Sequence, residues 1–249
     1  MAFPALRTLL LTLSIIVAFP PATLCADCKK IGGFSSLQPG DPLPDDWKPM
    51  TFDSIDRHTS YALVRDQGRT VLKAESVQAA SGVIRPVRID PRTYPWLVWS
   101  WKIKHVLEKG DLRSKDGDDY PARVYVAFAF DPDQAGIWAR LRHKGASMAA
   151  GRELPGSALN YIWANKAPKG TIAPSPYARE SMLVAVQSGN TGRGQWTTER
   201  RNLVQDYQRA FDRKPPEIIG LAVMTDSDDT GEQTTGYYGD IQLCREAGN

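Results

Sequence analysis

The sequence is poor in side chains that bind metals or carry out redox chemistry, with three cysteines and three histidines in 249 residues. His58, His105 and His143 stand far apart, and no cysteine or acid lies near them at the spacing of a zinc site. There is no G-x-S-x-G motif, and the glycine-rich residues 189–194 match neither a P-loop nor a G-x-G-x-x-G motif. We therefore expect no zinc centre and no nucleophile-elbow hydrolase, and we expect residues 189–194 to form a loop.

Charge is nearly balanced, with 31 Lys and Arg against 28 Asp and Glu and a net charge of +3. Proteins that bind nucleic acid or a membrane surface usually carry a concentrated patch of basic residues, so neither partner is expected here. Long hydrophobic runs are also missing, apart from residues 9–19 near the N-terminus. That run is too short to span a membrane, and no membrane span is predicted.

The N-terminus has the pattern of a secretory signal. Arg7 precedes the apolar run, and Leu24-Cys25-Ala26 is a plausible cleavage site. We predict a signal peptide over 1–26 and one domain over 27–249, exported to the periplasm or secreted as a monomer. A lipid anchor on Cys25 or Cys28 is the alternative.

Cleavage after position 26 leaves two cysteines, Cys28 and Cys244, at opposite ends of the mature chain. In an oxidising compartment such a pair is most simply a disulfide. The alternative is two free thiols.

Short strands separated by turns dominate the mature chain. Residues 61–65 and 70–75 flank Asp66-Gln67-Gly68 and predict a hairpin. Residues 82–89 form another strand, where Pro86 indicates an edge or a bulge. In the strand over 96–103, alternation places Leu97, Trp99, Trp101 and Ile103 on one face.

The segment DDYPARVYVAFAF over 118–130 predicts a strand with two unlike faces. The core face carries the following residues: Tyr120, Ala122, Val124, Val126, Phe128 and Phe130. The other face begins with Asp119, Arg123 and Tyr125 and ends with alanines. We expect this second face to be an open, polar recognition surface.

Helical patterns are few. Residues 136–151 carry apolar positions at helical spacing, and residues 197–211 form a clearer helix with Thr197 as its cap. Further strands are expected at 159–163, 182–186, 217–225 and 237–244. The predicted fold is therefore mainly β, a two-sheet β-sandwich of jelly-roll type with one or two inserted helices.

Aromatic residues divide into two groups. Trp99, Trp101, Tyr161 and Trp163 lie on strand faces and are expected in the core. The tryptophans at 96, 138 and 196 border loops and are candidates for exposed platforms.

Several motifs resemble a family of exported bacterial proteins known as domain of unknown function 3047. They are WSWK (99–102), DDYPARVYV (118–126), LNYIW (159–163), Trp196, DY (206–207), MTDSDDTG (224–231) and YGDI (238–241). The resemblance covers most of the mature chain and implies no established activity. More loosely, the N-terminal half is similar to galactose-binding-like jelly rolls and carbohydrate-binding modules.

We expect the ligand site at Lys102, Asp119, Arg123 and Tyr125, flanked by Trp163. If the two strands are neighbours, these side chains share one face. Arginine offers a rigid fork to paired hydroxyls or a carboxylate, and aromatic rings can stack on a sugar. The alternative is a surface Arg–Asp ion pair, which contributes little.

The loop over 226–231 concentrates acids. Asp226 and Asp228 are candidate calcium ligands, although the spacing does not match an EF-hand and acids are also common in turns. Asp118, Asp119 and Asp240, together with these two, are candidates for a pair of glycosidase acids.

Three functions remain open at this point. The leading hypothesis is an exported, non-catalytic binding protein for carbohydrate or a similar polyhydroxylated ligand of the cell envelope, with calcium as a possible cofactor. The second is a hydrolase or lyase acting on glycans, with Asp119, Asp226 or Asp228 as its acids and Tyr125 or Lys102 as a base. The third is an envelope module that binds another protein through exposed tryptophans.

Overall fold

A computed structural model of the chain describes residues 27–133 and 154–246, and six positions between them (137, 140, 143, 144, 147 and 148). The signal peptide expected over 1–26 and most of the helix expected over 136–151, including Trp138, lie outside the described residues. No helix within the described residues is long and apolar enough to cross a membrane.

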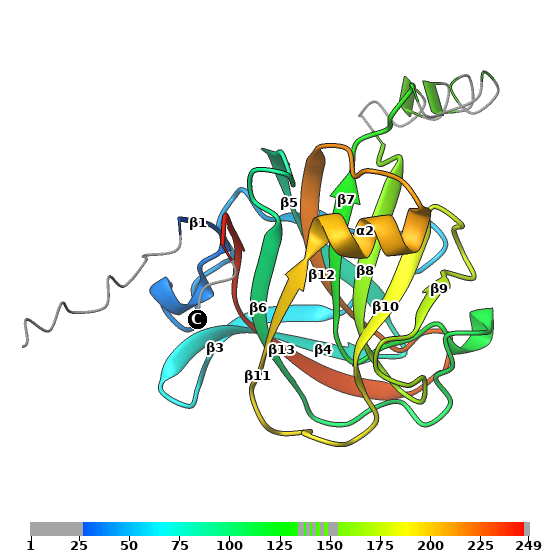
Figure 1. Ribbon diagram of the computed structural model, residues 1–249. Helices are drawn as coiled ribbons and strands as arrows, with labels where there is room; N and C mark the ends of the chain where they lie inside the picture. The colour runs from blue at the N-terminus through cyan, green and yellow to red at the C-terminus, as the bar shows by residue number, and fades with distance from the viewer. Residues whose placement is uncertain are drawn as a thin grey trace, which may run out of the picture.

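Two β-sheets pack face to face and enclose the core, which confirms the predicted sandwich (Figure 1). The six-stranded sheet has the order β11-β6-β13-β4-β3, and β1 also pairs with β13. Its strands are β1 (Cys28–Gly32), β3 (Ser60–Asp66), β4 (Arg69–Val77), β6 (Trp96–Ile103), β11 (Thr197–Asn202) and β13 (Gln233–Cys244).

The seven-stranded sheet has the order β2-β5-β12-β7-β8-β10-β9. Its strands are β2 (Lys48–Met50), β5 (Ala80–Ile89), β7 (Arg123–Phe128), β8 (Ser157–Ala164), β9 (Ile172–Pro174), β10 (Ser181–Ser188) and β12 (Ile218–Asp226). Its pairs are antiparallel except β8 with β10, which run parallel. Two short 3-10 helices, η1 (Phe34–Ser36) and η2 (Lys115–Gly117), and the helix α2 (Leu203–Phe211) complete the described elements.

The core follows the predicted alternation of aromatic and aliphatic side chains. Trp99 and Trp101 of β6 point between the sheets and contact Tyr161 and Trp163 of β8, with ring centroids 5.2 and 5.9 Å apart. All four are fully buried, as expected from their strand faces. Burying aromatic side chains of this size contributes much of the stability of such a sandwich.

Two local predictions are confirmed in detail. The hairpin of β3 and β4 turns at Gln67 and Gly68, whose φ angles of 46° and 83° fit a tight hairpin turn. In β5, β2 pairs only with residues 82–84, so Pro86 lies beyond β2, where its missing N–H is tolerated. The ladder of β5 with β12 shifts register between Ile218 and Gly220, opposite Pro86.

The helix predicted over 197–211 begins later than expected. Residues 197–202 instead form β11, an edge strand hydrogen-bonded along β6. The helix starts at Leu203, where the Asn202 side chain caps it by accepting a hydrogen bond from the Gln205 N–H at 3.1 Å. The helical spacing of the apolar residues therefore holds from Leu203 onward, and the preceding polar residues pair with β6 instead.

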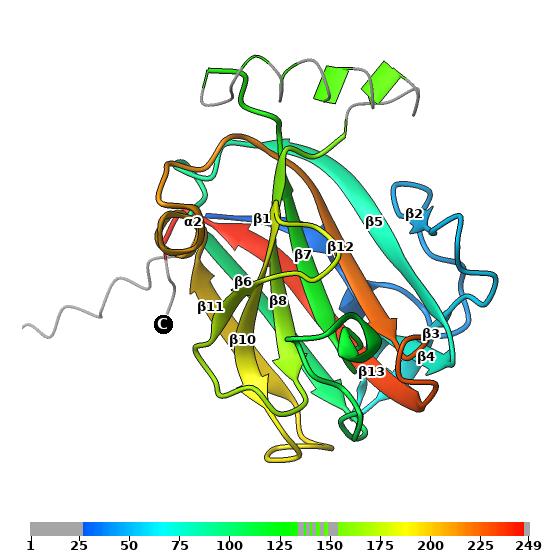
Figure 2. The same cartoon turned by 90° about the vertical axis from the view of Figure 1, so that its right-hand side faces the viewer.

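The outer face of the seven-stranded sheet is covered where an open surface was expected. Strand β7 begins only at Arg123, so the alternation does not extend back to Tyr120. Tyr120 packs instead with Leu112 on Ile162 and Ala164 of this outer face. The loop that carries η2 therefore lies over β7 and β8 (Figure 2), and the prediction of an open face is wrong here.

Gly236 of β13 marks a close approach between the two sheets. A Cβ at this position would overlap the carbonyl oxygen of Pro121 and crowd the Thr225 Oγ1 at 2.7 Å. We expect Gly236→Ala to lower the free energy of unfolding by about 1–3 kcal/mol, because backbone cannot move aside cheaply. Urea denaturation measures this. Gly33→Ala is the control, since its Cβ would meet nothing nearer than 3.5 Å, and an equal loss in both variants would contradict the prediction.

Candidate functional site

Arg123 lies in a buried polar cluster beneath the loop that carries η2. Its Nε donates to Asp226 Oδ1 at 2.9 Å, and its Nη2 donates to Asp226 Oδ2 and to the backbone carbonyl of Asp118. Asp226 also accepts a hydrogen bond from the Tyr120 N–H at 3.0 Å. The fork of arginine and the two oxygens of Asp226 thus form a bidentate pair.

Aromatic hydroxyls and rings enclose this pair. The guanidinium lies 4.3 Å from the centroid of the Tyr120 ring, and its Nη1 donates to the Tyr125 hydroxyl at 3.1 Å. Burial raises the pKa of Tyr125 to about 12, so its hydroxyl stays protonated near neutral pH. Burial alone would lower the pKa of Arg123, but Asp226 holds it well above its usual value. The cluster is therefore a buried polar network organised around the pair of Arg123 and Asp226.

The structure does not bring all the expected ligand-binding residues together. Asp119, Arg123 and Tyr125 lie close to one another along and before β7, but Lys102 belongs to β6 of the other sheet. Trp163 is fully buried in the core, where its indole N–H donates to the Gly189 carbonyl at 2.9 Å. Lys102 therefore belongs to a separate surface.

That second surface is the outer face of the six-stranded sheet, and its centre is the aromatic platform: Asp66, Arg69, Lys102, Trp196 and Tyr237. Lys102 and the Trp196 indole N–H each donate to one oxygen of Asp66, both at 2.6 Å. The Lys102 Nζ lies 4.5 Å from the Tyr237 ring centroid, and the Arg69 guanidinium lies 4.0 Å from that of Trp196. Trp196 and Tyr237 are both half-buried, so part of each ring faces solvent.

The charges of the platform are fixed by their contacts. Partial burial raises the pKa of Asp66, but hydrogen bonds from Lys102 and Trp196 outweigh it and hold this pKa below its usual value. The carboxylate therefore stays ionised and orients both donors. Trp196 was expected at a loop border, whereas Asp66, Arg69 and Tyr237 had no signal in the sequence, because their contacts join segments far apart in the chain.

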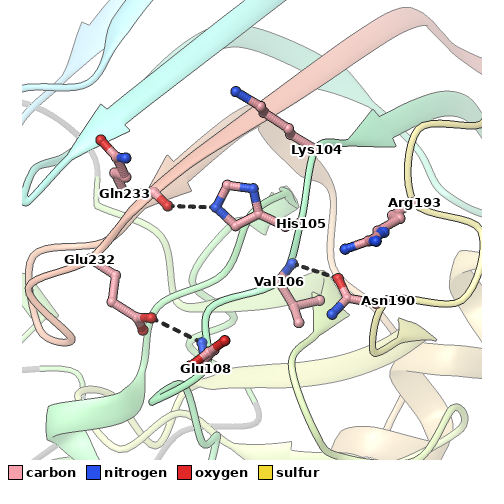
Figure 3. Close-up of a pocket in the computed structure, with 8 residues that line it drawn as sticks. All are labelled: Lys104, His105, Val106, Glu108, Asn190, Arg193, Glu232 and Gln233. Atoms are coloured by element: carbon pink, nitrogen blue, oxygen red, sulfur yellow. Dashed lines mark hydrogen bonds between the residues drawn. The ribbon is translucent and has the colours of Figure 1, made fainter.

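Next to the platform, the loops at one end of the sandwich enclose an open hollow of about 620 Å³. Figure 3 shows the side chains around it, with Arg193 reaching in from one side and Glu232 from the other. The loop hollow is lined by Lys104, His105, Val106, Glu108, Asn190, Arg193, Glu232 and Gln233.

Backbone groups fix the rim of the loop hollow. The Asn190 Oδ1 accepts from the Val106 N–H at 3.2 Å, and Glu232 accepts from the N–H groups of Glu108 and Lys109 at 3.1 and 3.0 Å. His105 contacts the Gln233 carbonyl at 2.9 Å. The hollow thus presents amides, carboxylates and cations on an ordered frame.

The aromatic platform and the loop hollow are close together along the chain. β6 ends at Ile103, which stands between Lys102 of the platform and Lys104 of the hollow. The loop between β10 and β11 supplies Arg193 to the hollow and Trp196 to the platform, and the Gly194 N–H binds the Ile103 carbonyl at 2.8 Å. The end of β6 and the loop between β10 and β11 therefore each contribute residues to both the platform and the hollow.

The acids of the expected calcium loop separate into two environments. Asp226 is bound by Arg123, whereas Asp228 lies with Asp119 and Asp229. One carboxylate oxygen from each of these three residues lies within 4.8 Å of the others. Asp240 lies elsewhere, where it accepts hydrogen bonds from the Ser35 N–H and hydroxyl at 2.8 and 2.5 Å.

Comparison with known proteins gives a family and several distant structural likenesses. A family described as "Protein of unknown function (DUF3047)" matches residues 45–242. No curated protein matches the sequence.

Among solved structures, the chain is similar to the family 11 carbohydrate-binding module of the cellulosomal cellulase Lic26A-Cel5E of Clostridium thermocellum. The two share 10% identity with a TM-score of 0.43, over 87% of this chain and 93% of the module. It is also similar to an arabinose-bound α-L-arabinofuranosidase, MgGH51, with 10% identity and a TM-score of 0.39. That match covers 86% of this chain and 26% of the arabinofuranosidase chain.

Proposed function

This chain belongs to the DUF3047 family, and we propose that it is an exported, non-catalytic binding protein for carbohydrate or a similar polyhydroxylated ligand. The observation that carries the proposal is the aromatic platform together with the loop hollow, because one loop supplies Arg193 to the hollow and Trp196 to the platform. Trp196 and Tyr237 are half-buried, and the exposed parts of their rings offer apolar surface to a sugar beside the cations of Arg69 and Lys102. The hollow offers charged and amide groups for its hydroxyls.

Preorganisation supports a binding role for this surface. Asp66 holds Lys102 and Trp196 in place, and Glu232 and Asn190 hold the rim of the loop hollow. A ligand that binds here meets groups that are already oriented, so less entropy is lost on binding. The disulfide between Cys28 and Cys244 fits an oxidising compartment outside the cytoplasm.

The acids considered for glycoside hydrolysis lie outside this surface. Asp119 and Asp226 are buried, Asp226 is paired with Arg123, and Asp240 is bound to Ser35. A glycosidase needs two carboxyl groups that face the scissile bond. Asp118, Asp119 and Asp226 are buried, and neither half-buried Asp228 nor Asp240 lines the hollow, which favours binding without hydrolysis in the proposal.

We expect the mature protein to bind members of a glycan array of neutral, acidic and amino sugars, and Arg193→Ala and Trp196→Ala to weaken binding of the best glycan about tenfold or more. Isothermal titration calorimetry measures the affinity. Arg193 is exposed, so its loss leaves the fold intact. Lys48→Ala is the matched control, because Lys48 is an exposed cation on the other sheet.

Two outcomes would contradict the proposal. Release of shortened products from a bound glycan would make the protein an enzyme. Failure to bind any glycan, or equal affinity in Arg193→Ala, Trp196→Ala and the unaltered protein, would remove this surface as a carbohydrate site.

A further inference from the structure

The antiparallel pairing of β7 with β12 brings two acidic segments together. Met224 lies opposite Arg123, so the chain just before β7 runs beside the chain just after β12. Asp119 lies in the first segment, and its Oδ2 accepts a hydrogen bond from the Thr230 N–H at 2.6 Å in the second. Asp228 and Asp229 precede Thr230, which places the three carboxylates within 4.8 Å of one another.

Asp119 is fully buried, yet its second oxygen has no hydrogen-bond partner among the described residues. A buried carboxylate oxygen without a partner costs several kcal/mol in general, and two further carboxylates beside it add repulsion. The cluster therefore lacks a positive group at its centre.

Nearby cations among the described residues have their contacts elsewhere. Arg123 is bound to Asp226, and the Lys109 Nζ donates to the Thr230 carbonyl at 3.1 Å. The Lys115 Nζ lies 5.4 Å from the centroid of the Tyr177 ring. Tyr177 in turn donates its hydroxyl to Asp229 Oδ1 at 2.6 Å, which orients that carboxylate without neutralising it.

We propose that Asp119, Asp228 and Asp229 bind a calcium ion. The donors are oxygens only, which suits a hard cation rather than zinc or copper. Asp228 and Asp229 are half-buried, so solvent reaches the cluster and waters can complete the six to eight ligands that calcium takes. Magnesium requires a regular octahedron, and three carboxylates from two irregular segments fit calcium better.

The ion would connect segments that also shape the loop hollow. Glu232 follows Thr230 in the same turn and holds the backbone of Glu108 and Lys109 at the rim of the hollow. Calcium at this cluster therefore stabilises the turn between β12 and β13 and the loop before β7. The proposal does not depend on carbohydrate binding, because its readouts are metal affinity and stability.

The test is a calcium titration of the mature, chelator-treated protein by isothermal calorimetry, with thermal unfolding in parallel. We expect saturable binding and a Tm increase of about 3–6 °C at a calcium concentration roughly tenfold above Kd. Asp228→Asn and Asp229→Asn should each weaken binding about tenfold or more, because each removes a ligand charge. Asp116→Asn is the matched control, since Asp116 is an exposed acid in the adjacent η2.

Terbium provides a second readout that does not depend on stability. It binds at calcium sites, and its emission is sensitised by a nearby tyrosine, here Tyr177, which contacts Asp229. Calcium should displace terbium, and Tyr177→Phe should lose most of this emission, because phenylalanine absorbs little light at the wavelength that excites tyrosine. If the protein binds no calcium at about 1 mM, the weak end of the affinity range of extracellular calcium sites, the proposal is overturned. Asp119 and Asp228 would then share a proton instead of a metal ion. Binding unchanged by Asp228→Asn and Asp229→Asn, or binding of magnesium alone, would overturn it equally.

Discussion

Arg123→Ala is expected to lower the free energy of unfolding by about 3–5 kcal/mol, because it leaves the carboxylate of Asp226 buried without its counter-charge. Arg123 and Asp226 side chains are only 4% and 3% exposed, so water cannot replace the lost hydrogen bonds. Burial raises the pKa of Asp226, and the guanidinium of Arg123 opposes that rise. Without Arg123, this acid must either take up a proton or bear the cost of a buried charge.

Urea denaturation in the presence of chelator measures the effect free of any contribution from calcium. Arg113→Ala is the matched control, because Arg113 pairs with Asp111 at the surface and its side chain is 80% exposed. We expect the control to leave the urea midpoint unchanged within error.

A double variant separates the lost partner from the lost packing. Arg123→Met with Asp226→Leu removes both charges and keeps most of the side-chain volume, and buried ion pairs replaced in this way often lose little stability. It should therefore be more stable than Arg123→Ala. An Arg123→Ala midpoint equal to that of the unaltered protein would contradict the buried pair.

Burial also changes what an Arg123 variant reports. The sequence places Arg123 beside Tyr125 on a polar strand face, where loss of the side chain would report ligand binding. The loop that carries η2 covers this face, so its loss reports stability instead. A covering loop cannot be inferred from the strand itself, because alternation gives the face of a residue and not what lies over it.

Sequence patterns predicted the elements whose side chains point into the core. Trp99 and Trp101 alternate with smaller or polar residues, and this period of two holds throughout β6 because one of its faces packs into the core between the sheets. The pattern was less informative at 197–202, where pairing with β6 decides the structure. An edge strand made of polar residues has no hydrophobic alternation that would identify it. The helical spacing that begins at Leu203 was therefore extended too far towards the N-terminus, to Thr197.

The candidate site was less predictable, because contacts between distant segments make it. Asp66 joins Lys102 and Trp196, which lie 36 and 130 positions further along the chain. Asp228 was identified from its acidic loop, but its neighbour Asp119 enters only through the pairing of β7 with β12. A single sequence gives residue types and local periods, and sheet order is needed to bring them together.

Breaking the disulfide between Cys28 and Cys244 is expected to destabilise the protein by about 2–5 kcal/mol. The bond closes a loop with a sequence separation of 216 residues, and the chain-entropy contribution grows with loop length to about 5 kcal/mol at this size. It also fixes β1 to the end of β13, where Cys28 lies directly opposite Cys244 in the ladder. We expect the double variant Cys28→Ala, Cys244→Ala to unfold at a lower urea concentration.

Dithiothreitol distinguishes the bond from the packing of the two side chains. The reductant should lower the urea midpoint of the unaltered protein to that of the double variant, and leave the double variant unchanged. Just beyond the disulfide, Arg245 and Asp27 form an ion pair with an N···O distance of 2.7 Å. Surface ion pairs of this kind contribute little to stability, so this one cannot hold the termini together once the disulfide is broken. If reduction leaves the urea midpoint of the unaltered protein unchanged, the prediction is wrong, and the β1–β13 ladder alone holds the termini together.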